Sequence, residues 1–453
     1  MVGLLEMLSG CHIRAVAAFM IGVQIKETPL PRQFSKGQNA VSQYGTGDVP
    51  WRGTVMAMLG AAAIALTLSP APPAPAQVLR PEVRFPFLAD PLLDDPLDPL
   101  LPNPSVPRPI SPLEQLALEQ DLDQLALEAA ALDQAGDLDE ARLIWRREVR
   151  LRRLLGIEQE LAAIDRVGQV LRDRNVTQDL QLYTVRLNEI RADLTLPENG
   201  DLLQTMAATY VVLGAVESAA EIHQALADGA VLRGDRAEQR RQLETLATLR
   251  ADWFYFPEAA TVYGELVGLA QAAGDREAEL GFLKLQANNL EQAQDIAGAI
   301  ALYQQLLLAY QGNEALWPQI PPLQHQVATH YRTLGNLEVA ARQYQAAYTN
   351  AIAQQQLEVA ANAITDLAEI YKTLGRWADV GYLYEQLLVV GQQGHNAFAK
   401  MSAYDQLGQV HEQLGNTPFA LAAYREGLVL ARVLRTQQDY FETQIARLTE
   451  GAL

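Results

Sequence analysis

Three segments near the end of the chain superimpose at a constant offset of 40 residues: HYRTLGNLEVAARQY (330–344), IYKTLGRWADVGYLY (370–384) and VHEQLGNTPFALAAY (410–424). In each segment a Leu-Gly pair is followed, nine residues after the glycine, by a tyrosine, and a small residue lies seven residues before the glycine. Apolar residues recur at three- and four-residue spacing on both sides of the pair, which predicts a helix on each side. A glycine after a helix can adopt positive φ and reverse the chain, so each segment is predicted to be a helical hairpin.

The same spacing extends backwards through the chain in weaker sequence. Eight turns are predicted, near Gly136, Asn175, Gly214, Phe254, Gln294, Gly335, Gly375 and Gly415. The residue seven before each turn is small in all eight cases: Ala129, Gly168, Ala207, Ala247, Ala287, Ala328, Ala368 and Gly408. The residue nine after each turn is, in order, Trp145, Thr184, His223, Tyr263, Tyr303, Tyr344, Tyr384 and Tyr424. One hairpin cannot bury both its faces, so the repeats must stack. Residues 113–453 are therefore predicted to form an all-α solenoid of about eight stacked antiparallel helical hairpins.

The small residue and the tyrosine are predicted to form a large-against-small pair where two helices cross, as close packing requires. With Tyr331 and Tyr371, the Leu-Gly turn, the alanine after it and the second aromatic, the pattern resembles the tetratricopeptide repeat (TPR) family. It departs from that family in its period of 40 residues rather than 34, and in lacking the proline that often closes the family's repeat. Longer helices around the same core explain both departures. Trp253 stands at the place of the leucine in the Leu-Gly pairs and is predicted to be a core residue.

Composition narrows the class of function. The chain has a formal net charge of −19 and a single cysteine, Cys11, in 453 residues. This acidic balance argues against a nucleic-acid partner, because phosphate contacts need clustered cations. One cysteine excludes a disulfide framework. The histidines show no metal-ligand spacing, and the sequence has no phosphate-binding loop or nucleophile motif. We therefore expect no catalytic residue, no metal and no cofactor, and a protein that is not an enzyme.

Residues 1–54 show no clear periodicity and are predicted to be poorly structured, or to precede a true translation start near Val55. Arg52, an apolar run at 55–68 and Ala74-Pro75-Ala76 give residues 55–76 the form of a signal peptide. The run of 14 residues is short for a membrane span. We expect cleavage between Ala76 and Gln77, transient membrane contact, and export to the periplasm, or to the thylakoid lumen of a photosynthetic cell. The alternative is a buried helix of a cytosolic domain.

Residues 77–112 are predicted to be a Pro-rich linker, because ten prolines between 81 and 112 fix φ and remove hydrogen-bond donors. Both a spacer and a motif that docks on aromatic grooves fit this composition. Ser111 and Glu114 then form the pattern of an N-terminal capping box. The arginines of residues 138–154 are predicted to lie on a solvated face near Asp137, Asp139 and Glu140, with an anionic docking patch as the alternative.

The resemblance implies a superhelix whose first helices line a concave groove, and this groove is the expected site for a protein or peptide. The family's groove positions correspond here to His325, Thr329, Arg332, Asn362, Thr365, Asp366, Glu369, Lys372, Asp405, Gln409 and Glu412. Polar groups of mixed sign suit an extended peptide or a helix. The alternative is that these residues form only the solvent-exposed face of a solenoid and bind no partner. Arg332, Glu369 and Lys372 are expected to be exposed and to add little to folding.

The carboxylate clamp of the TPR family needs cations at positions where this chain has other residues. Lys284 and Asn288 match its first pair, but Gln326, Asn362 and Asp366 follow, so the clamp is interpreted as absent. The leading hypothesis is a non-enzymatic scaffold or assembly factor that binds a protein or peptide in an extracytoplasmic compartment. The alternatives are a ligand-sensing TPR regulator and a helical solenoid accessory to a cell-envelope enzyme.

Overall fold

The computed structural model describes residues 79–94, 96–102 and 108–450, which belong to the second of the chain's two compact units. The predicted upstream segment 1–54 and the signal-like segment 55–76 lie outside the described residues. Within the described residues the secondary structure is helical throughout, and no strand occurs there. The predicted all-α class is therefore confirmed.

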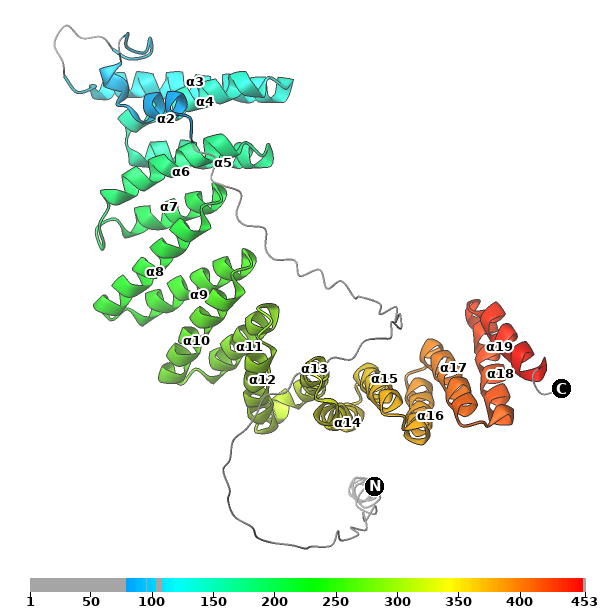
Figure 1. The fold of residues 1–453 in the computed structure, drawn as a ribbon. Coiled ribbons are helices and arrows are strands. Elements are labelled where there is room, and N and C mark those ends of the chain that lie inside the picture. The colour runs from blue at the N-terminus through cyan, green and yellow to red at the C-terminus, as the bar shows by residue number, and fades with distance from the viewer. Residues whose placement is uncertain (1–78, 95, 103–107, 451–453) are drawn as a thin grey trace, which may run out of the picture. The chain divides into compact units, whose positions relative to one another are not determined.

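Sixteen helices pair in chain order into eight hairpins, and each helix packs against the next along the chain (Figure 1). The pairs are α3 (Pro112–Ala135) with α4 (Leu138–Arg152), α5 (Ile157–Asp173) with α6 (Thr177–Ala192), α7 (Gly200–Val212) with α8 (Val216–Arg233), α9 (Arg236–Asp252) with α10 (Phe256–Ala273), α11 (Arg276–Gln292) with α12 (Ile296–Gln311), α13 (Ile320–Thr333) with α14 (Leu337–Ala353), α15 (Leu357–Thr373) with α16 (Trp377–Gln393), and α17 (Ala397–Gln413) with α18 (Thr417–Leu434). The short helices η2 (Arg153–Leu155) and η3 (Glu314–Gln319) join hairpins, and α19 (Gln438–Glu450) follows the eighth.

All eight predicted turn positions have positive φ, which confirms the repeat register. Five are glycines, with φ between 69° and 94°. The other three are Asn175, Phe254 and Gln294, with φ of 57°, 64° and 64°. Non-glycine residues enter this left-handed region at a cost, so its recurrence at one place in every hairpin indicates that the reversal requires it. Ser111 and Glu114 form the predicted capping box at the start of α3.

The large-against-small packing is also confirmed. All eight small residues are buried, and Trp145 and the five tyrosines at the partner position are buried with them. A Cβ added to Gly408 would lie 2.5 Å from the Tyr424 ring, so the ring fills the space that the missing side chain leaves. The second hairpin differs by one residue, because Tyr183 is buried where the repeat places Thr184, which is half-buried.

The residue before the turn residue is a core residue in the third hairpin, where Leu213 is buried, but not in the fourth or in the last three hairpins, contrary to the prediction for that position. Leu334, Leu374, Leu414 and Trp253 are all among the exposed large hydrophobic residues. Each is the C-cap of its helix. In these four helices the neighbouring helices leave the C-cap residue exposed, whereas Leu213, the C-cap of α7, is covered.

The expected Pro-rich spacer is wrong for its described part, which folds onto the first hairpin. Pro81 starts α2 (Pro81–Leu88), as proline can at the first helical position, and η1 (Pro91–Leu93) follows. Phe87 is buried beneath the Arg153 guanidinium, 4.7 Å from the ring centroid. Asp98 accepts from Arg147 at 2.7 Å, and Asp94 accepts from Arg150 at 2.7 Å. These ion pairs hold a segment whose composition alone indicated no packing.

The arginines of α4 and η2 do not form the predicted solvated face. Arg142 and Arg146 both donate to Asp179 of α6, whose carboxylate is buried, while only Arg142 reaches Asp139. Arg153 donates to the buried Glu160 of α5 at 3.0 Å. Carboxylates of other elements thus neutralise most of this charge, so the run serves hairpin packing.

Candidate binding surface on the first helices

The eleven predicted site residues lie on α13, α15 and α17, the first helices of the last three hairpins. The structure divides them into three groups. Six charged or polar residues of α13 and α15 form contacts within these helices or with a neighbouring helix, three residues of α17 are covered by α19, and Asn362 and Thr365 line an open groove.

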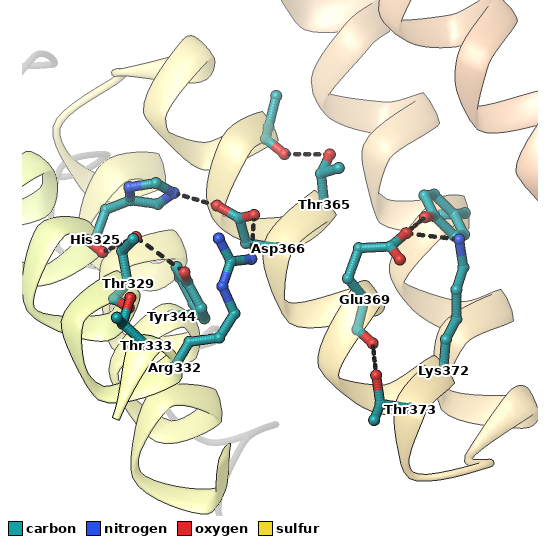
Figure 2. A network of polar contacts seen from close by, with 12 residues as sticks. His325, Thr329, Arg332, Thr333, Tyr344, Thr365, Asp366, Glu369, Lys372 and Thr373 are labelled. Carbon is teal, nitrogen blue, oxygen red and sulfur yellow. Dashed lines mark hydrogen bonds and ion pairs between the residues drawn. The ribbon is translucent and has the colours of Figure 1, made fainter. Parts of the chain in front are cut away.

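Asp366 of α15 is the centre of the first group (Figure 2). His325 Nε2 lies 2.8 Å from one carboxylate oxygen and Arg332 Nη1 lies 2.7 Å from the other, so α13 is tied to α15. Thr329 Oγ1 lies 2.9 Å from Tyr344 Oη, and the Arg332 guanidinium lies 5.7 Å from the centroid of the same ring. Burial alone would raise the pKa of Asp366, but the hydrogen bonds from His325 and Arg332 outweigh it and the pKa is lowered.

Lys372 makes an equivalent link from α15 to α17. Its Nζ donates to Glu369 at 2.7 Å (Figure 2). The same atom donates to Gln406 at 2.5 Å and lies 5.1 Å from the Tyr384 ring centroid. Burial would lower the pKa of Lys372, but its hydrogen bond with Glu369 and its contacts with Tyr384 outweigh burial, so the pKa is raised. The expectation that Arg332 and Lys372 are free surface charges is therefore wrong. Successive first helices lie parallel, and each cation reaches the next one along.

The predicted site residues of the eighth hairpin are covered by helix α19 of the same chain. Tyr440 of α19 donates to Asp405 at 2.7 Å, and Arg447 of α19 donates to Glu412 at 2.6 Å. Gln409 donates to Asp405 at 2.9 Å. Helix α19 therefore stands where the first helix of a ninth hairpin would stand, and it removes these residues from the open surface.

Asn362 and Thr365 line a groove of about 510 Å³ between α15 and α17. Leu387 and Val390 of α16 contribute apolar side chains, and Phe398 of α17 is 59% exposed. Within the described residues, the side chains of Asn362 and Ser402 have no hydrogen-bond partner, although both line the groove. Sequence reasoning missed Phe398 and Ser402, although Ser402 stands one 40-residue repeat after the predicted Asn362.

The same groove occurs at two other places in the repeat. Between α11 and η3 it measures about 530 Å³ and is lined by Leu280, Gly281 and Lys284, two repeats before the groove at Asn362. Between α5 and α7 it measures about 400 Å³ and is lined by residues such as Leu161 and Asp165. The groove is thus a recurring product of hairpin stacking, with different side chains at each occurrence.

Two residues at positions of the carboxylate clamp, Asn288 and Gln326, form hydrogen bonds with other residues of the repeats. Asn288 accepts from Tyr303 at 2.8 Å, and Gln326 donates to Glu291 at 2.7 Å. Among the described residues, no group of three His, Cys, Asp or Glu side chains could hold a metal ion. No helix in the described ranges is long and apolar enough to cross a membrane.

Comparison with known proteins gives a likeness of fold only. No family model matches the chain, and no curated protein matches it. Among solved structures, BtubC (BKLC) from P. vanneervenii is 19% identical, with a TM-score of 0.34, over 49% of this chain and 90% of that one. Kinesin light chain TPR-like repeats of Podosopora anserina are 15% identical, with a TM-score of 0.32, over 43% of this chain and 97% of that one. Aspartyl phosphate phosphatase F from Bacillus subtilis is 14% identical, with a TM-score of 0.35, over 73% of this chain and 80% of that one.

The class of the protein follows from its own hairpins. Eight helical pairs share one turn geometry and a buried small residue seven positions before the turn, and they stack in chain order. The chain is a TPR-like helical-repeat protein with repeats of about 40 residues.

Proposed function

We propose that this protein is a non-enzymatic scaffold that binds a protein or peptide segment on the first-helix surface of its repeats. The observation that supports this proposal is the groove between α15 and α17. It combines apolar side chains with unpaired amide and hydroxyl groups, and its size is that of a small binding pocket.

The groove has the chemistry to hold an extended chain. The Asn362 amide can both donate to and accept from a peptide backbone, and Ser402 adds a hydroxyl across the groove. Phe398 and Leu357 offer apolar surface for a partner side chain. Exposure of the apolar Phe398 ring to water is unfavourable. Contact with a partner would bury the ring and remove that cost.

The test is to recover the partner from the native compartment with the full chain and then to measure its affinity for variants. The double variant Asn362→Ala/Phe398→Ala should bind about tenfold more weakly or worse, because it loses an aromatic contact and a hydrogen bond. Tyr382→Ala is the matched control, since Tyr382 is an exposed aromatic of α16 that does not line the groove. Equal affinity of the double variant and the wild type would refute the groove as the site.

We also propose that the scaffold works outside the cytoplasm. The support is the sequence alone: the apolar run at 55–68 and Ala74-Pro75-Ala76 have the form of a signal peptide and its cleavage site. N-terminal sequencing of the protein from its natural source should give a chain that starts at Gln77. An intact cytosolic chain that starts at Met1 would refute both the cleavage and the location.

A further inference from the structure

Helix α3 carries an exposed stripe without charge along its length. The members share one side of the helix at three- and four-residue spacing: Leu113, Leu116, Gln120, Gln124, Leu127 and Ala131. Leu113, Leu116 and Leu127 are 80%, 52% and 66% exposed. The opposite side of the helix holds Leu118 and Leu122, which are buried against the rest of the first hairpin. A helix normally directs its apolar residues to one side only, so this second apolar stripe needs an explanation.

In later hairpins the corresponding positions are covered. Gln124 stands twelve residues before the turn of its hairpin, and Ala131 stands five residues before it. In the last three hairpins the residues at these two positions are all buried: Leu323 and His330, Ala363 and Ile370, and Ala403 and Val410. His330 shows what covers them, since its ring stacks on Tyr303 of α12 in the preceding hairpin. No described hairpin precedes α3, and α2 packs on α4 instead. The stripe is thus a stacking surface to which the described residues supply no neighbour.

We propose that a second copy of this chain covers the stripe, with the two α3 helices antiparallel about a two-fold axis. The stripe is self-complementary in that arrangement. An axis that passes between Gln120 and Gln124 brings Leu116 of one copy opposite Leu127 of the other. The same axis pairs Gln120 with Gln124 across the centre, where the amides can donate to and accept from one another.

The lack of charge on the stripe permits a second copy as the occupant. Each copy has a net charge of −19, so two copies repel wherever acidic faces meet. The stripe lies on a helix with six acidic side chains and no basic one, yet none of those acids belongs to it. A neutral surface within an acidic helix lets like-charged copies meet there without placing charge against charge on the stripe itself.

The dimer is expected to be weak. Helix α3 has 24 residues, a length of about 36 Å, so one helix pair covers less than the area of a standard interface. We therefore expect reversible association at concentrations of roughly 10 to 100 μM, in the range of small transient contacts.

Disulfide trapping in the full chain, with Cys11→Ser to remove the natural thiol, tests the arrangement. Leu116→Cys/Leu127→Cys should give a covalent dimer under mild oxidation, because each new cysteine faces the other in the second copy. Leu116→Cys alone should give little dimer, because the antiparallel register separates the two copies of residue 116. Efficient trapping by Leu116→Cys alone would refute the antiparallel arrangement, and no trapping by the double variant would refute the dimer.

Sedimentation equilibrium gives an independent readout. Leu116→Glu/Leu127→Glu should abolish the concentration-dependent rise in mass while circular dichroism stays unchanged, because both side chains are exposed in the monomer. Leu308→Glu/Val433→Glu is the control, since these residues of α12 and α18 are as exposed but lie outside the stripe. A wild-type chain that stays monomeric to about 100 μM would overturn the proposal, since an interface of this class should associate below that concentration. If maleimide also failed to label the Leu116→Cys thiol in that monomer, the stripe would be covered within the same chain, by the residues upstream of α3.

Discussion

Ala368→Trp should unfold or uncouple the seventh hairpin. Ala368 is fully buried where α15 crosses α16, in one core cluster with Tyr384. The equivalent pair in the next hairpin shows how little space is left, because even a Cβ on Gly408 would lie 2.5 Å from the Tyr424 ring. An indole at this crossing must push the two helices apart. We expect a loss of at least about 3 kcal/mol in the free energy of unfolding, at or beyond the upper end of overpacking costs.

Urea unfolding followed by circular dichroism measures this effect. Each hairpin contacts chiefly its neighbours, so a break at the seventh should split the single transition into two, one on each side of the break. Gln354→Ala is the control, because Gln354 is a half-buried C-cap of α14 and its truncation should change stability by less than about 0.5 kcal/mol. If the two variants unfold at the same urea concentration, the repeat register is wrong.

The repeat could be predicted from the sequence because its signals are local. A positive-φ turn and a small residue seven positions earlier are requirements of the backbone at one place, so they recur at fixed spacing even in weak copies. The three turns at Asn175, Phe254 and Gln294 could be placed without glycine for this reason. The Pro-rich segment could not be predicted, because its packing depends on Asp94 and Asp98 meeting arginines more than forty residues away.

The site was predicted less well than the fold for a related physical reason. The spacing placed Arg332, Asp366 and Lys372 on one surface, and they do lie there. Spacing along one helix does not reveal which side chain stands opposite on the next helix. The structure shows that these charges are satisfied by residues of the following first helix, 34 positions on, as in Arg332 to Asp366 and Lys372 to Gln406. The predicted residues that are left open, Asn362 and Thr365, carry no charge and lie earlier on α15 than Asp366 and Lys372.

Glu160→Gln should destabilise the N-terminal hairpins more than any surface substitution. The Glu160 carboxylate is buried and accepts from Arg153 at 3.0 Å and from Arg186 at 2.7 Å, so it is the shared counter-charge of two guanidinium groups. Burial lowers the pKa of Arg153 to about 10 even with this carboxylate beside it, so the cation is already costly to hold. Removing one partner of a buried ion pair usually costs about 3 to 5 kcal/mol, because the other charge stays buried and unpaired.

The structure predicts where the damage appears first. Arg153 also donates to the Leu88 carbonyl and covers the Phe87 ring, so weaker placement of Arg153 should release α2 from the first hairpin. Limited proteolysis of Glu160→Gln should therefore cut within residues 81–102 under conditions that leave the wild type intact. Glu158→Gln, an exposed position on the same helix, is the matched control and should behave as the wild type. Equal stability and equal protection in the two variants would mean that α2 and the first hairpin hold together without this charge pairing.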